Sequence, residues 1–274
     1  MSGEPIAGGG ATASPLLVES ADGIVVVTLN RLEAKNALDR AQIEALTGFA
    51  LQAQTDPALR AVILRGSGAI FSAGADLGML ASAAGEAESL LAQRAAVSFG
   101  PRLCEAWERI EAPTIAAIEG PCVGGGLALA LSCDFRVAGA GATFRLPEVP
   151  LGMNMSWGSL PRLASLVGPS RAKQLAIFGG PIDIGRALDW GLIDEAAEQG
   201  GAADLAAAWA RRLAALPPVP VRMTKEAINA ASGALHRSTS VMDRDQWLLT
   251  AGSKDLAEGV AAFLEKRPPE FKGD

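Results

Sequence analysis

Two short stretches of the chain place small residues directly after apolar runs, and together they could polarise one oxygen atom. The first is Phe71–Asp76 and the second is Glu119–Ala128, which contains three consecutive glycines. Glycine lets a ligand approach the backbone, and a helix that begins after the second stretch would expose N–H groups with partial positive charge. One N–H group from each stretch would form an oxyanion hole, in which a donor contributes about 3 kcal/mol to the transition state. The alternative is that both are tight turns between a strand and a helix.

Glu148 is the acidic residue whose neighbours favour acid–base chemistry. It follows Leu146-Pro147 and precedes Val149-Pro150. A carboxylate among apolar residues is poorly solvated, which raises its pKa and lets it exchange protons near neutral pH. The alternative is a loop glutamate that is exposed to water.

Other catalytic residue types are scarce in the chain. His236 is the only histidine, and its Leu-His-Arg setting favours a position on a surface helix, so a Ser-His-Asp triad is poorly supported. The cysteines Cys104, Cys122 and Cys133 have no metal-ligand spacing, and we expect no metal site. The glycine turn lacks the spacing of a dinucleotide-binding or P-loop motif.

Composition limits the class of protein. Hydrophobic residues make up 49% and charged residues 20% of the 274 residues, which is typical of a globular protein. The net charge of −6 and the absence of a basic cluster argue against a nucleic-acid partner. No apolar run is long enough to span a bilayer. The odd number of cysteines and the lack of a signal peptide favour a cytoplasmic location.

Strands and helices alternate through the first two thirds of the chain, the pattern of an α/β layered fold. An Asp22-Gly23 turn predicts a hairpin between the first two strands. The expected strands cover residues 16–19, 24–29, 61–64, 70–76, 114–118 and 135–138. The expected helices cover residues 39–54, 90–110 with an interruption at Gly100-Pro101, and 127–132. Asp39 and Gln42 have the spacing of a capping box at the start of the first helix.

The last third of the chain is predicted to be helical. The expected helices cover residues 184–190, 202–216, 221–231, 240–250 and 255–264, with Pro217-Pro218 ending the second of them. We therefore divide the chain into a disordered tail over residues 1–14, a core with the site over 15–200 and a helical region over 201–274. These helices carry more apolar surface than the core can cover, which favours a subunit interface.

The motifs together resemble the enoyl-CoA hydratase/isomerase, or crotonase, family over residues 16–272. The segments that carry the resemblance are Asn30-Arg31 with Asn36-Ala37-Leu38, Phe71–Asp76, Pro113–Gly126, Pro147-Glu148 with Leu151-Gly152, and Ala262–Arg267. The resemblance implies a spiral of repeated ββα units followed by a helical C-terminal trimerisation region. It also implies an acyl-CoA thioester substrate, with coenzyme A as part of the substrate and no permanently bound cofactor, and a homotrimer or homohexamer.

The resemblance assigns roles to individual residues. The N–H groups of Ala75 and Gly125 would form the oxyanion hole, and the Ala73 carbonyl would accept from the adenine amino group. Ala34 and Lys35 would line the entry for coenzyme A. Phe263 and Lys266 would reach coenzyme A, often across a subunit boundary. The alternative for the two lysines is a solvated surface position.

The chain departs from the family pattern at Ala128. Family hydratases use two glutamates to handle water; Glu148 matches the second and the first falls on Ala128. One carboxylate suits a 1,3 proton shift, so the resemblance favours an enoyl-CoA isomerase. The alternatives are an enoyl-CoA hydratase and a CoA-thioester-binding protein of low activity. The residues expected to shape the acyl pocket, if they are not plain core, are Asp76, Leu77, Ala128, Met153 and Trp157.

Overall fold

The first hairpin forms as its turn sequence predicts. A computed structural model describes residues 14–76, 78–79 and 89–274 of the chain. Strand β1 (Leu16–Ala21) pairs antiparallel with β2 (Ile24–Leu29), with Ala21 opposite Ile24. Asp22 and Gly23 have φ values of 52° and 77°, the left-handed pair that a tight hairpin turn requires.

Two sheets organise the core. The six-stranded sheet has the order β1-β2-β3-β4-β6-β9, and every pair after the hairpin is parallel. The three-stranded sheet has the order β5-β7-β8. The remaining strands are β3 (Ala61–Gly66), β4 (Thr114–Ile118), β5 (Pro121–Val123), β6 (Phe135–Gly139), β7 (Thr143–Arg145), β8 (Ile182–Asp183) and β9 (Glu195–Ala197).

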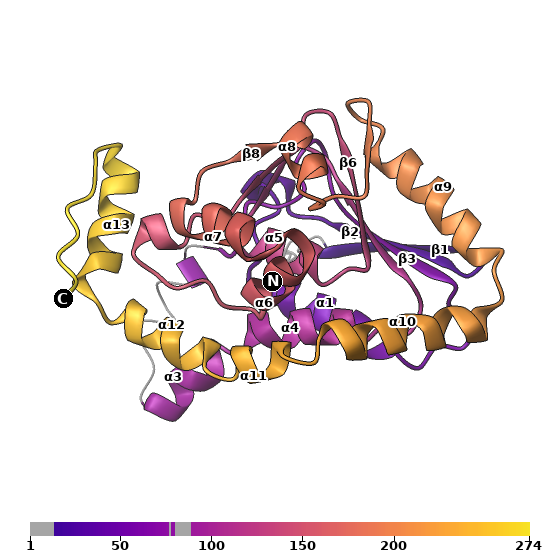
Figure 1. The fold of residues 1–274 in the computed structure, drawn as a ribbon, viewed down its shortest axis with the longest axis horizontal. Coiled ribbons are helices and arrows are strands. Elements are labelled where there is room, and N and C mark those ends of the chain that lie inside the picture. The colour runs from indigo at the N-terminus through magenta and orange to yellow at the C-terminus, as the bar shows by residue number, and fades with distance from the viewer. Residues whose placement is uncertain (1–13, 77, 80–88) are drawn as a thin grey trace, which may run out of the picture.

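Helices cover both faces of the six-stranded sheet. The side chains of β3, which point alternately to the two faces, show what packs on each. Val62 and Leu64 belong to the main core, which also holds α1 (Arg40–Ala53), α4 (Phe99–Glu108) and α5 (Gly125–Leu131). Ala61 and Ile63 face the other way and pack with α9 (Ala202–Ala214). Helix α9 is drawn in orange beside the strands (Figure 1). Burial on both faces explains why the parallel strands are almost wholly apolar.

The C-terminal third is helical, as predicted. Figure 1 shows α10 to α13 running from beneath the sheet to one end of the molecule, where α13 stands away from the strands. The helices after β7, besides α9, are α6 (Ser159–Val167), α7 (Pro169–Phe178), α8 (Ile184–Asp189), α10 (Pro218–Ser232), α11 (His236–Ser240), α12 (Asp243–Ala251) and α13 (Lys254–Glu265). None of the helices in the described ranges has the length and apolarity needed to cross a bilayer.

Several local predictions were wrong. Residues 70–76 form only two isolated bridges rather than a strand, because Gly74 (φ 97°) turns the backbone out of an extended ladder. The interruption in 90–110 falls at Val97-Ser98, between α3 (Leu90–Ala96) and α4, and Pro101 lies in the first turn of α4, where no N–H is needed.

Two helix starts also differ from the prediction. Helix α10 begins at Pro218, three residues before the expected 221, since proline suits the first helical position. Helix α5 begins at Gly125, two residues before the expected 127. The second shift matters for the site, because it places the first N–H groups of the helix inside the glycine turn.

Candidate active site

The turn around Ala75 is held by Leu38. The Leu38 N–H donates to Gly74 O at 2.7 Å and Leu38 O accepts from the Asp76 N–H at 3.0 Å. Ser72 Oγ accepts from the Gly74 N–H at 3.1 Å. The N–H groups on both sides of Ala75 are therefore engaged, whereas no described group accepts from the Ala75 N–H itself. The turn presents that N–H to a ligand.

The glycine turn before α5 presents the second donor. Gly124 has a φ of 51°, donates to Arg145 O at 2.9 Å and accepts from the Ala128 N–H at 2.9 Å. Gly125 is the first residue of α5, and its N–H has no acceptor among the described residues. This N–H lies at the positive end of the helix.

The fold brings the two turns into contact. A Cβ built on Gly125 would lie 3.2 Å from the Ala75 nitrogen, and one built on Gly74 would lie 3.5 Å from the Gly125 nitrogen. The isolated bridge between Ser72 and Cys122 joins the two segments just before these turns. Two unpaired N–H groups at this separation can hold one oxyanion.

Glu148 lies against the same glycine turn. It follows β7 and precedes the 3-10 turn η2 (Val149–Leu151), and its Oε1 would be 2.6 Å from a Cβ on Gly124. Its Oε2 is shielded from water and has no hydrogen-bond partner. Burial raises the pKa of Glu148 to about 7, against smaller opposing contributions from its own N–H and from Arg145. Such a carboxyl group can both take and give a proton near neutral pH.

Ala128, which the resemblance predicts to stand in place of a second carboxylate, lies on α5. Its methyl group is fully buried in the main core, and its carbonyl accepts from Ser132 Oγ at 2.9 Å. The nearby Asp76 does not replace it, because its Oδ2 is 2.6 Å from Arg31 Nη1 and its Oδ1 accepts from the Gly78 N–H. The bond to Arg31 lowers the pKa of Asp76. Glu148 is thus the protonatable group of this arrangement.

A sequence model described as enoyl-CoA hydratase/isomerase matches residues 19–274. The chain belongs to the enoyl-CoA hydratase/isomerase family. It is 34% identical to mevalonyl-coenzyme A hydratase of Beauveria bassiana over 91% of both chains. It is 32% identical to 2,3-dehydroadipyl-CoA hydratase of Escherichia coli over 95% of this chain and 99% of that protein. It is 35% identical to a probable enoyl-CoA hydratase of Bacillus subtilis over 92% of this chain and 96% of that protein.

Solved structures confirm the crotonase-like fold. An enoyl-CoA hydratase from Mycobacterium avium subsp. paratuberculosis superposes with a TM-score of 0.85 at 29% identity, over 95% of this chain and all of that one. An enoyl-CoA hydratase/isomerase from Pseudoalteromonas atlantica superposes with a TM-score of 0.84 at 29% identity, over 94% and 100%. The chain is therefore an enzyme of the enoyl-CoA hydratase/isomerase family.

The residues expected at the coenzyme A entrance lie beside the Ala75 turn. Ala34 ends the 3-10 turn η1 (Leu32–Ala34), and the exposed Lys35 follows with a φ of 56°. The Ala73 N–H donates to Lys35 O at 3.0 Å, so the two backbones run side by side. The exposed Lys35 therefore lies next to the segment that leads into the Ala75 turn.

Asn36 holds the turn at the expected coenzyme A entrance in place, and the sequence did not predict this role. The fully buried Asn36 bonds through its side chain to the Arg31 N–H at 3.1 Å, to Ser67 and to Ile70 O at 2.8 Å, and its carbonyl accepts from Ser72 Oγ. It therefore ties the lysine-bearing turn to the Ala75 turn. The available signal was an asparagine in the quoted motif, since asparagine tolerates the positive φ of 53° seen here.

Phe263 and Lys266 lie at the far end of α13. Phe263 is 55% exposed, and Lys266 ends the helix with a φ of 55°. Neither forms a hydrogen bond or an ion pair with residues 34–35 in the part of the chain that is described. The start of α13 packs against η2, the turn that follows Glu148, and a Cβ on Gly152 would lie 2.4 Å from Asp255 O.

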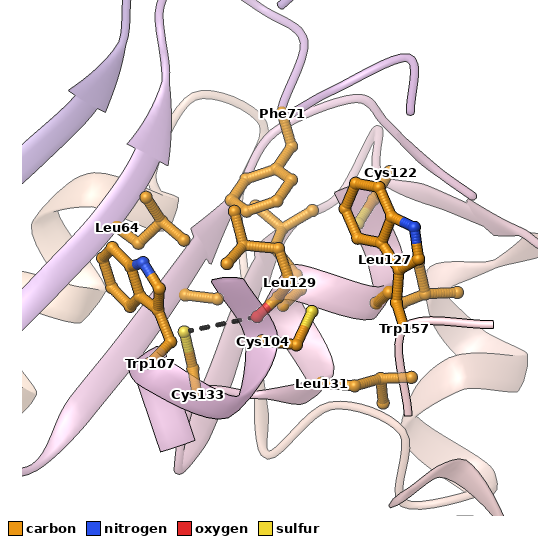
Figure 2. Close-up of a cluster of buried hydrophobic side chains, with 14 of the residues drawn as sticks. Leu64, Phe71, Cys104, Trp107, Cys122, Leu127, Leu129, Leu131, Cys133 and Trp157 are labelled. Carbon is orange, nitrogen blue, oxygen red and sulfur yellow. Dashed lines mark hydrogen bonds between the residues drawn. The ribbon is translucent and has the colours of Figure 1, made fainter. Parts of the chain in front are cut away.

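One of the expected pocket residues, Met153, is bonded to Glu148, and another, Trp157, lies in the buried cluster around α5. The Met153 N–H donates to Glu148 O at 3.0 Å and its side chain is 6% exposed. Trp157 belongs to the buried cluster around α5, which Figure 2 shows with the Cys133 Sγ to Leu129 O hydrogen bond. Leu77 lies outside the described residues.

His236 is not part of this site. It begins α11, and its Nε2 lies 2.9 Å from Ser165 Oγ on α6. Burial lowers the pKa of His236. The imidazole lines a cavity of about 1270 Å³ that includes neither Glu148 nor the two turns. The pairing with a serine resembles part of a triad in residue types only, since the unpaired N–H groups of Ala75 and Gly125 are elsewhere.

Proposed function

We propose that the enzyme shifts the double bond of an enoyl-CoA, with Glu148 as its single acid and base. The observation that carries this proposal is the unpartnered Oε2 of Glu148 beside the glycine turn, with Ala128 at the position of a second carboxylate. A pKa of about 7 leaves a large fraction of Glu148 ionised at neutral pH, ready to take a proton.

The reaction would run in two proton transfers. The Glu148 carboxylate takes a proton from C2 of a 3-enoyl-CoA, and the electron pair moves onto the thioester oxygen to give a dienolate. The N–H groups of Ala75 and Gly125 hold that oxygen. Glu148 then returns the proton to C4, the double bond forms between C2 and C3, and no atom is gained or lost.

Coenzyme A would enter as part of the substrate. Ala34, Lys35 and Ala73 would bind its adenosine and phosphate portion, and Phe263 and Lys266 would reach coenzyme A, in this chain or in a neighbour. Asp76, Leu77, Ala128, Met153 and Trp157 would surround the acyl group. We also propose a homotrimer or homohexamer located in the cytoplasm, built through the apolar faces of the C-terminal helices, and no permanently bound cofactor or metal.

An enoyl-CoA hydratase is the second candidate. The curated relatives described above are named hydratases, which favours it. Glu148 would then have to orient and deprotonate water without a second carboxylate. A low-activity CoA-thioester-binding protein is the third candidate.

Product mass separates these reactions. The enzyme is incubated in turn with a 3-enoyl-CoA and a 2-enoyl-CoA, and the products are weighed and chromatographed. Isomerisation gives a 2-enoyl-CoA of unchanged mass from the first substrate. Conversion of the second substrate alone, with the mass of one water added, would replace the proposal by the hydratase. Binding of both without conversion would favour the binding protein.

A further inference from the structure

The backbone at Trp157 is held in an uncommon conformation by surrounding charged residues. Trp157 has a φ of 66°, a region that bulky residues rarely adopt, and Gly158 follows with 62°. The Gly158 N–H donates to Asp243 Oδ2 of α12 at 2.7 Å. Arg162 Nη1 donates to Trp157 O at 3.1 Å and to Gly158 O at 3.0 Å, while its Nη2 binds Glu108. Strain of this kind persists where neighbours fix it and often marks a functional position.

The indole of Trp157 is wedged between two glycines on different helices. A Cβ on Gly100 of α4 would lie 2.0 Å from Trp157 Cε2, and a Cβ on Gly125 of α5 would lie 2.8 Å from Cη2. Any larger residue at either position would displace the ring. The six-membered ring therefore lies against the residue whose N–H is one of the two oxyanion donors. Figure 2 shows the ring at the side of the buried cluster, near the segment that carries Leu127.

Trp157 also borders a large cavity. Trp157 and Gly158 line the cavity of about 1270 Å³, together with Ser98, Pro101 and Arg244. Trp157 is only 9% exposed, and its ring lies between Gly100 of α4 and Gly125 of α5 rather than standing free in the cavity. One side chain thus separates the oxyanion donors from a large cavity.

We propose that Trp157 closes the acyl end of the site and restricts the enzyme to short acyl thioesters. The proposal rests on the proposed function, because it requires the thioester oxygen to lie between Ala75 and Gly125. With the oxygen there, a growing acyl chain meets the indole edge beside Gly125. Removal of the indole opens a path into the cavity, where further methylene groups find room.

The test compares chain-length preference in wild type, Trp157→Ala and Trp157→Phe. The kcat/KM values for 3-hexenoyl-CoA and 3-dodecenoyl-CoA are measured for each protein. A hydrophobic pocket discriminates by roughly tenfold or more per methylene group that it cannot accommodate. We therefore expect the dodecenoyl to hexenoyl ratio to rise at least about tenfold in Trp157→Ala and less in Trp157→Phe. Trp209→Phe, on α9 far along the chain, is the matched control and leaves the ratio unchanged.

The outcomes distinguish this proposal from the proposed function. An unchanged ratio in folded Trp157→Ala, or in Trp157→Phe if the alanine variant does not fold, overturns the role of Trp157. If wild type converts neither substrate, the proposed function fails instead. Calorimetry with saturated hexanoyl-CoA and dodecanoyl-CoA then still tests the closure: tighter dodecanoyl-CoA binding by the Trp157 variants than by wild type supports it, and equal binding refutes it.

Discussion

The two glycine turns and the C-terminal helices differ in the kind of group that has no partner within a single chain. The turns carry polar groups of this kind, and the helices carry apolar side chains. At the turns, the N–H groups of Ala75 and Gly125 and the Oε2 of Glu148 have no hydrogen-bond partner among the described residues. The C-terminal helices expose several large apolar side chains, among them Val219 at 63% and Leu249 at 78%. N–H donors without a partner can bind a single oxygen atom, whereas exposed apolar surface can bind the surface of another protein chain. We therefore expect the chemistry at the turns and the assembly through the C-terminal helices.

The largest expected effect comes from a substitution that changes the site at the glycine turns and leaves the C-terminal helices intact. Glu148→Gln keeps the shape of the side chain and removes its ability to take a proton, so turnover should fall by about 10³-fold or more while coenzyme A binding is retained. Steady-state kinetics and calorimetry measure the two properties. Glu44→Gln, a change at an exposed helix position, is the control. Near-normal turnover by folded Glu148→Gln would defeat the assignment.

The second-largest expected effect comes from substitutions on the C-terminal helices. Val219 and Met223 lie one turn apart on α10 and are 63% and 65% exposed. We expect light scattering of the wild type to give three or six times the 28.1 kDa chain mass. Placing glutamate at both positions should convert the assembly to single chains, because charge is excluded from a buried apolar contact. Leu51→Glu, at an exposed position on α1, should leave the mass unchanged.

A wild-type protein that is a single chain at micromolar concentration and still turns over substrate would contradict the assembly. It would also remove the possibility that Phe263 and Lys266 reach the coenzyme A of a neighbour.

Local sequence predicted the turns better than it predicted what packs against them. The hairpin at Asp22-Gly23, the glycine turn before α5 and the position of Glu148 follow from residues next to one another in the chain. The indole of Trp157 depends on space left by Gly100 and Gly125, which are far from it in sequence. No local pattern encodes such a contact.

Two other predictions from local sequence, the strand at residues 70–76 and the capping box at α1, also differ from the structure. Residues 70–76 have the composition of a strand, but each potential partner offers only one bridge. The capping box at α1 is half formed: Asp39 accepts from the Gln42 N–H at 2.9 Å, whereas the Gln42 side chain donates to Pro15 O at 3.3 Å. At α1 the distant Pro15 takes the group that local sequence had assigned to the cap, whereas at residues 70–76 the turn at Gly74 ends the extended backbone.

A smaller expected effect follows from the raised pKa of Glu148 beside the glycine turns. The pKa of Glu148 is raised from 4.5 to about 7, so the folded protein binds more protons than the unfolded chain between these values. The free energy of unfolding therefore falls as pH rises through this range. Glu148→Gln should be more stable than wild type by about 3 kcal/mol near pH 8, and the difference should shrink near pH 4. Urea titrations at both pH values measure it, and a difference that is independent of pH would contradict the raised pKa.

The smallest expected effect concerns Ala128. Ala128→Glu restores a pair of carboxylates and should give a small gain in water addition to a 2-enoyl-CoA, about tenfold or less, because the site is fully buried and must repack. Ala128→Gln has the same size without the carboxylate and should show no gain. The rate of 3-hydroxyacyl-CoA formation measures both. A folded Ala128→Glu variant that binds substrate without hydrating it would show that the missing glutamate alone does not set the reaction.

The central claim is that one sheltered carboxyl group carries the proton from C2 to C4. A 3-enoyl-CoA with both hydrogens at C2 replaced by deuterium tests it most directly in a single turnover in ordinary water. If Glu148 Oε2 holds the deuteron away from solvent, a fraction of the 2-enoyl-CoA product keeps both deuterons, one of them at C4. A product that has lost one deuteron completely, with only solvent hydrogen at C4, would contradict transfer by a single sheltered group.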